Sequence, residues 1–124
     1  MDTAGRRTEP LSLRIGACDL TLVATDVNVL IDALRAECGV LKRRLVQLER
    51  EQPQSLEAAT RSIGRLTQLA ETFANAPSCA GEPPLELEGV QAHLVDDALS
   101  ELRSHQRREL TSGLAELKRA LYRL

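Results

Sequence analysis

The chain has 124 residues, a formal net charge of −2, and hydrophobic residues at 43% of its positions. This length predicts one domain, the hydrophobic content argues against wholesale disorder, and the charge excludes the strong positive field of a histone-like protein. Only Phe73 and Tyr122 are aromatic, and Trp is absent. Leu, Val, Ile and Ala must therefore fill the core, which favours packed helices.

The cysteines and the hydropathy pattern bear on the compartment. Cys18, Cys38 and Cys79 are odd in number and form no CxxC pair, which is typical of free thiols in a reducing environment. No stretch approaches the roughly 20 apolar residues that a membrane span needs, and residues 1–10 lead into no signal-like apolar run. We expect a cytoplasmic protein without membrane insertion.

The sequence predicts a flexible N-terminal arm over residues 1–10 and a single helix-rich domain over residues 11–124. Strict alternation at Leu11–Ile15 indicates a half-buried strand. Residues 16–19 can then turn into a second strand over 20–24. The rival interpretation begins a helix at Asp19, because Leu20 and Ala24 extend the following helical period backwards.

Residues 26–51 and 55–74 predict an antiparallel helical hairpin. Thr25 or Asp26 would cap the first helix, Pro53 would end it, and Ser55 would cap the second. The short connection makes the two helices fold back on each other. Apolar residues recur at spacings of three and four, as in a coiled-coil seam, at Val27, Ile31, Leu34, Cys38, Leu41, Leu45 and Leu48, and again at Leu56, Ala59, Ile63, Leu66, Ala70 and Phe73.

The C-terminal third follows a proline-rich loop over residues 75–84. Residues 85–88 either add a third strand to the N-terminal pair or lead into a helix that starts near Gly89. Residues 90–124 predict a long helix, bent or broken around residues 103–108, where its apolar face shifts. Its second half carries the leucines that we expect to form an interaction surface, which are Leu110, Leu114, Leu117 and Leu121.

Few side chains are candidates for catalysis or metal binding. His93, Asp97, Glu101 and His105 lie four residues apart on one helical face and are the candidate metal ligands. They lack the Glu-x-x-His spacing of di-iron bundles, so we expect no metal and no cofactor. Cys38 is predicted to be a core residue, with Cys18 and Cys79 accessible, and no nucleophile–base pair is recognisable. The glycines form no phosphate-binding loop; Gly39, Gly64 and Gly113 are predicted to serve close helix approach. We expect no enzyme.

Charge is distributed unevenly near the C-terminus. Residues 77–100 carry −5, whereas residues 101–124 carry +3. The cations of this basic segment are Arg103, Arg107, Arg108, Lys118, Arg119 and Arg123. A basic helix beside an acidic segment can self-associate head to tail or recruit a charged partner. Contact with phosphates is the alternative, although aromatic stacking platforms and a helix-turn-helix pattern are missing.

Three functional hypotheses follow. The leading one is a non-catalytic helical interaction module, which would be an adaptor, assembly factor or regulatory subunit acting through leucine seams in a homo-oligomer or with a partner helix. The second is a small nucleic-acid-associated regulator that uses the basic C-terminal helix. The third is a helical-bundle metal or redox protein.

Overall fold

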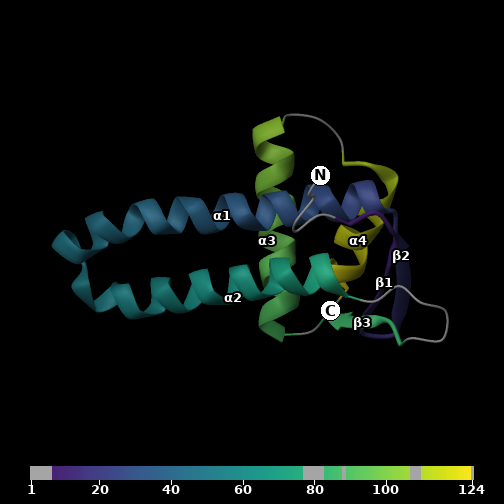
Figure 1. Ribbon diagram of the computed structural model, residues 1–124, viewed down its shortest axis with the longest axis horizontal. Helices are drawn as coiled ribbons and strands as arrows, with labels where there is room; N and C mark the ends of the chain where they lie inside the picture. The colour runs from purple at the N-terminus through teal and green to yellow at the C-terminus, as the bar shows by residue number, and fades with distance from the viewer. Residues whose placement is uncertain (1–6, 77–82, 88, 107–109, 124) are drawn as a thin grey trace.

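The computed structural model describes residues 7–76, 83–87, 89–106 and 110–123, without the side chains of residues 103–106. The chain is mainly α-helical with a small three-stranded sheet, as the sequence predicts (Figure 1). Its elements, in order, are β1 (Leu11–Ile15), β2 (Cys18–Leu22), α1 (Ala24–Glu51), a 3₁₀ turn (Pro53–Ser55), α2 (Leu56–Asn75), β3 (Leu85–Leu87), α3 (Gly89–Gln106) and α4 (Ser112–Tyr122).

The sheet begins as a tight hairpin. Ile15 pairs with Cys18, so the turn consists of Gly16 and Ala17 alone, and Gly16 adopts the φ of 60° that such turns require. The second strand therefore starts two residues earlier than predicted, and the rival helix from Asp19 is wrong. Strand β3 adds to the free edge of β1 in parallel, which gives the order β2-β1-β3.

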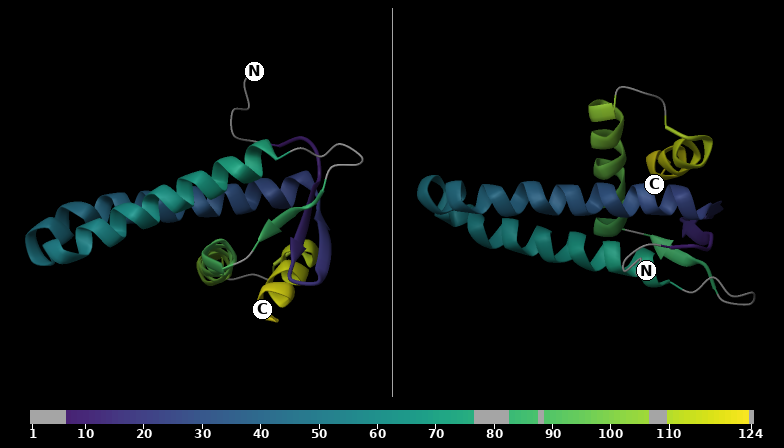
Figure 2. Two further views of the ribbon diagram at one scale, coloured as in Figure 1. Left: turned by 90° about the horizontal axis from the view of Figure 1, so that it is seen from below. Right: turned by 45° about the horizontal axis from the view of Figure 1, so that its top comes forward.

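Helices α1 and α2 form the predicted antiparallel hairpin, and Figure 2 shows them side by side along their length. The predicted N-cap of α1, Thr25 or Asp26, is wrong, whereas Ser55 stands at the N-cap of α2 as predicted. Val23 occupies the N-cap of α1 and Ser55 that of α2, and neither side chain accepts a capping hydrogen bond. Asp26 is turned inward instead, where it is buried and accepts a hydrogen bond from Thr111.

The described C-terminal residues form two helices, α3 and α4, with a break between them. Helix α3 ends at Gln106, and Thr111 caps α4 by accepting a hydrogen bond from the amide of Leu114 at 3.3 Å. Because the apolar faces of the two halves are offset, one straight helix could not bury both. The break lets Leu99 and Leu117 both reach the core, where each is 0% exposed.

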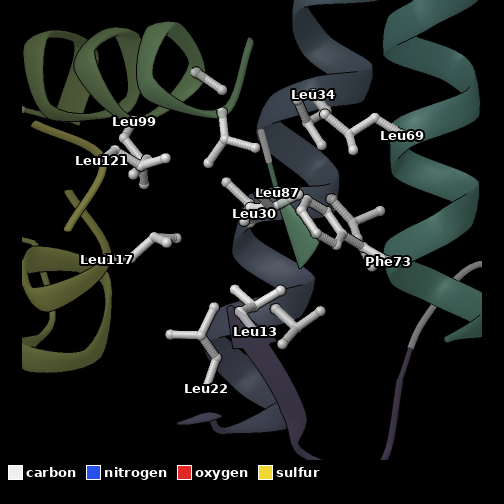
Figure 3. Close-up of a cluster of buried hydrophobic side chains, with 14 of the residues drawn as sticks. Leu13, Leu22, Leu30, Leu34, Leu69, Phe73, Leu87, Leu99, Leu117 and Leu121 are labelled. Carbon is white, nitrogen blue, oxygen red and sulfur yellow. The ribbon is translucent and has the colours of Figure 1, made fainter. Parts of the chain in front are cut away.

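One core joins the sheet to all four helices, and Figure 3 shows the side chains that meet there. The inner face of the sheet contributes Leu13 and Leu22, and α2 contributes Phe73, which is fully buried. The remaining labelled members are Leu30, Leu34, Leu69, Leu87, Leu99, Leu117 and Leu121. Leucines from both halves of the chain therefore share one interior.

Arg7 anchors the segment that precedes the sheet. Its guanidinium donates to the carbonyl oxygens of Phe73 and Ala76 at the end of α2, at 3.0 and 2.6 Å, and to those of Glu9 and Pro10. Its backbone amide donates to the side chain of Asn28 at 2.8 Å, and Asn28 donates back to the Arg7 carbonyl at 2.9 Å. The sequence predicted that the N-terminal residues 1–10 are flexible. Residues 1–6 lie outside the described residues, whereas Arg7 is bound to the domain by these hydrogen bonds.

Candidate functional site

The α1–α2 hairpin extends beyond the core as a projecting arm (Figures 1 and 2). The last buried residue of α1 is Cys38, and the first buried residue of α2 is Leu66. Residues 39–65, all of which the structure describes, contain no buried side chain, and we call this segment the arm. Its seam residues, each half-buried, are Leu41, Leu45, Leu48, Leu56, Ala59 and Ile63. Two helices cover each other along one stripe only, so the flanks of this seam stay open to a further helix.

The arm is positively charged. It holds six cations against three carboxylates, a net charge of +3 in a chain whose total is −2. Arg61 lies 3.7 Å from Glu57 in an exposed pair. Within the described ranges, no carboxylate lies at ion-pair distance from Lys42, Arg43, Arg44 or Arg50. These cations are therefore available to an external anion.

A groove lies at the base of the arm, between α1 and α2. Its volume is about 250 Å³, and its lining includes Arg35, Cys38, Gly39 and Lys42 from α1 and Thr67 and Ala70 from α2. The Cys38 thiol donates to the carbonyl of Ile63 at 3.4 Å and lies 3.2 Å from Thr67 Oγ1. Cys38 is only 7% exposed, as expected of a core residue. The floor is small and largely apolar, Arg35 and Lys42 are exposed on the α1 rim, and Glu71 is exposed on the α2 side.

The three helical glycines differ in their surroundings. A Cβ at Gly113 would lie 2.5 Å from Asp26 Oδ2, so this glycine does permit close approach, as predicted. A Cβ at Gly39 would meet only Nη1 of Arg43 at 3.6 Å, and one at Gly64 would meet no atom within 4 Å. The prediction is therefore wrong for Gly39 and Gly64. At both positions the missing side chain leaves open space on the surface of the arm.

The leucines predicted as an interaction surface in α4 lie in the core. Leu114, Leu117 and Leu121 are at most 7% exposed, and Leu110 is half-buried. Helix α4 packs against α3 and β2, so the chain itself covers this stripe. These leucines are therefore not a docking surface, which corrects the prediction. Their spacing shows that α4 has an apolar face, but it does not indicate that α3 and β2 bury that face.

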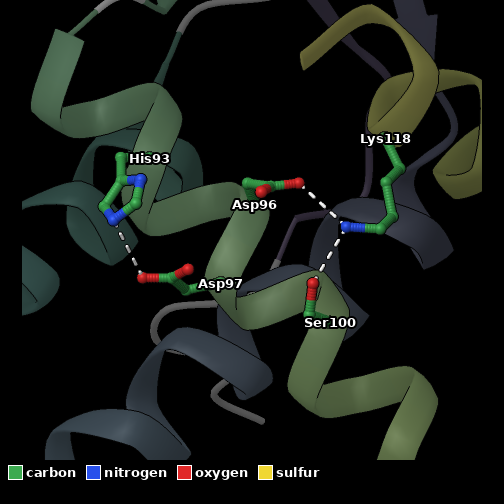
Figure 4. Close-up of polar contacts among 5 residues, drawn as sticks. All are labelled: His93, Asp96, Asp97, Ser100 and Lys118. Carbon is green, nitrogen blue, oxygen red and sulfur yellow. Dashed lines mark hydrogen bonds and ion pairs between the residues drawn. The ribbon is translucent and has the colours of Figure 1, made fainter. Parts of the chain in front are cut away.

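The structure describes the side chains of only three residues of the predicted basic patch, Lys118, Arg119 and Arg123. Lys118 donates to Asp96 and to Ser100, each at 2.9 Å, and so ties α4 to α3 (Figure 4). Arg119 and Arg123 are exposed. Arg107 and Arg108 lie outside the described residues, as does the side chain of Arg103.

Three of the candidate metal ligands, His93, Asp97 and Glu101, are exposed along α3. His93 Nε2 lies 3.4 Å from Asp97 Oδ2 in an exposed pair (Figure 4). Glu101 is exposed one turn further on, and the side chain of His105 lies outside the described residues. Across the part of the chain that the structure describes, no group of three His, Cys, Asp or Glu side chains could hold a metal ion. Cys18 is a half-buried residue of β2 rather than of the turn, and Cys79 lies outside the described residues.

The arm and its groove were not identified from sequence. The available signals were the run Lys42-Arg43-Arg44 and two glycines, Gly39 and Gly64, inside otherwise regular helical repeats. No family model, curated protein or solved structure matches the chain. None of the helices in the described ranges has the length and apolar character that crossing a membrane demands.

Proposed function

We propose that the protein is a non-catalytic helical interaction module, an adaptor, assembly factor or regulatory subunit, and that it acts through the arm. The observation that carries this proposal is the contrast along one helical hairpin. The half of the hairpin near the sheet is buried by the core, whereas residues 39–65 contain no buried side chain and keep a half-buried leucine seam.

The geometry supports binding by helix pairing. An arm of two helices projects its seam away from the domain, where a partner helix can lie on it without disturbing the core. The exposed cations on its surface add electrostatic attraction and raise the rate of encounter with an acidic partner. The occupant of the seam is another protein or a second copy of this chain.

Site-specific photocrosslinking in the cells that produce the protein tests this proposal. Val46 in the arm and Val23 at the start of α1 are 61% and 58% exposed, which makes them matched positions for a photoreactive amino acid. We expect Val46 to give a discrete protein adduct, or an adduct of twice the 13.6 kDa chain, and Val23 to give none.

The adduct must also depend on the seam. Leu45→Asp, combined with the photoreactive residue at position 46, should abolish it, because a carboxylate in the half-buried stripe opposes helix pairing. Equal crosslinking from Val46 and Val23, or an adduct that survives Leu45→Asp, would contradict a role for the arm.

A further inference from the structure

The groove between α1 and α2 combines three properties that define one kind of occupant. Its floor is small and largely apolar at Cys38 and Ala70. Its α1 rim carries Arg35 and Lys42, and neither has a carboxylate at ion-pair distance within the described ranges. Gly39 stands between these cations and leaves the space above the floor unfilled.

Gly39 lowers the stability of α1, and the packing around it does not require a glycine. A glycine in a helix interior lowers helix stability by about 1 kcal/mol relative to alanine. Close helix approach does not require it, since a Cβ there would make only an ordinary contact with the flexible end of Arg43, at 3.6 Å. What the missing side chain provides is open volume in the groove.

We propose that this groove receives an acidic amphipathic helix of another protein, which sets an apolar side chain over Gly39 and carboxylates against Arg35 and Lys42. The inference rests on the proposed role of the arm as an interaction surface and names the chemistry of its partner. Arg35 and Lys42 are seven residues apart, which is about 10 Å or two helical turns. Carboxylates two turns apart on a helix laid along α1 match this spacing.

The hairpin already binds a helix of this character within the chain. Helix α3 packs on α1 and α2, buries Ala92, Val95 and Leu99 along one stripe, and carries no Lys or Arg from residue 89 to residue 102. The groove offers an apolar floor and two cations on its α1 rim, at a place that α3 does not line.

Charge and shape disfavour other occupants. A second copy would bring its arm, also +3, against a positive surface, and its own acidic helix α3 is already packed on its hairpin. Nucleic acid would meet an apolar floor and the carboxylate of Glu71 on the α2 side of the groove. A helix with a hydrophobic stripe and acids facing α1 satisfies both features.

The test uses the full chain and synthetic helical peptides in fluorescence anisotropy. The probe is a hydrocarbon-stapled acidic peptide with a leucine midway between two glutamates seven residues apart. Its controls replace the two glutamates by lysine, or the leucine by alanine. A fluorescent DNA duplex of similar length is titrated in parallel. We expect binding of the acidic peptide only, weakening as salt is raised.

Variants of the chain separate filling of the groove from general effects. Gly39→Leu should weaken binding by about tenfold or more by occupying the groove, whereas Gly64→Leu, the matched glycine elsewhere in the arm, should leave it unchanged. Both changes replace glycine by a better helix former, so neither should lower the unfolding temperature. The double change Arg35→Glu with Lys42→Glu should reverse the preference and favour the lysine peptide.

The inference is overturned if the acidic peptide fails to bind, if Gly39→Leu binds it as tightly as the wild type, or if the duplex binds in its place. Those outcomes are distinguishable from failure of the proposed function. A Leu45-dependent protein adduct at Val46 would persist if the arm binds a partner of different chemistry, and it would vanish if the arm binds nothing.

Discussion

Thr111 Oγ1 donates a hydrogen bond of 3.0 Å to Asp26 Oδ1 and joins the first turn of α1 to the N-cap of α4. The same hydroxyl accepts the amide of Leu114 at 3.3 Å, so one side chain both caps α4 and fixes it to α1. Asp26 is 7% exposed and lies 85 residues away in sequence. This contact holds the C-terminal helix in the core.

The first prediction concerns this contact. Thr111→Ala should lower the free energy of unfolding by about 1–2 kcal/mol, because it removes an N-cap and the donor to a buried carboxylate. Thr111→Ser keeps the hydroxyl and should stay within about 0.5 kcal/mol of the wild type. Urea denaturation measures both, and equal midpoints for Ala and Ser would show that the hydroxyl contributes nothing.

The second prediction compares two helical glycines. Gly113→Ala should destabilise by roughly 1–3 kcal/mol, because the new methyl group meets Asp26, which Thr111 holds in place. Gly64→Ala should stabilise by about 0.5–1 kcal/mol, because the surface there is open and alanine restricts the unfolded chain. Opposite shifts in thermal unfolding are expected, and shifts of the same sign would refute the packing difference.

The third prediction concerns Arg7. Arg7→Ala should lower the free energy of unfolding by about 2–3 kcal/mol, because it removes charge-assisted hydrogen bonds to carbonyls at the end of α2. Arg7→Lys should recover only part of this loss, since an ammonium cannot reach all of these oxygens. Arg61→Ala, at an exposed pair in the arm, serves as the control and should change stability by no more than about 0.5 kcal/mol. An unchanged urea midpoint for Arg7→Ala would contradict the anchoring role.

The fourth prediction separates the core from the arm. Leu117→Asp should destabilise by more than about 3 kcal/mol, because the side chain is 0% exposed and a charge there has no partner. Leu45→Asp should cost less and leave the chain folded, since the half-buried side chain can turn towards water. Circular dichroism melting of the two variants measures the difference. Comparable losses would mean that the arm is as integral to the core as α4.

The fifth prediction is a pKa. The Arg14 guanidinium, through a hydrogen bond of 2.8 Å and its charge, holds the pKa of the Asp19 carboxyl below its ordinary value of 3.8. The stability that the pair contributes is therefore present above pH 3.8 and is lost as the pH falls through the lowered folded-state pKa. An NMR titration should show the Asp19 pKa rising towards 3.8 in Arg14→Gln and in high salt. A pKa unchanged by the substitution would exclude the pairing.

Local patterns were sufficient for the elements whose signals act within a few residues. The three-four spacing from Val27 to Leu48 and the proline at position 53 predicted the α1–α2 hairpin. Alternation at Leu11–Ile15 predicted β1, because side-chain direction in a strand has a period of two whatever the strand pairs with. The predicted start of α1 was less accurate. Asp26 has the residue type of an N-cap, yet its carboxylate accepts a hydrogen bond from Thr111 at the start of α4.

Long-range contacts were decided by the tertiary structure alone. Nothing in the local sequence indicates that Arg7 would meet the carbonyls of Phe73 and Ala76, because these groups come together only when the hairpin folds against the sheet. The leucine stripes show the same division. Their spacing determined that one face of each helix requires cover, since apolar surface in water is unfavourable. The topology decided that α3 and β2 cover Leu117, whereas Leu45 lies on an arm that the core does not reach.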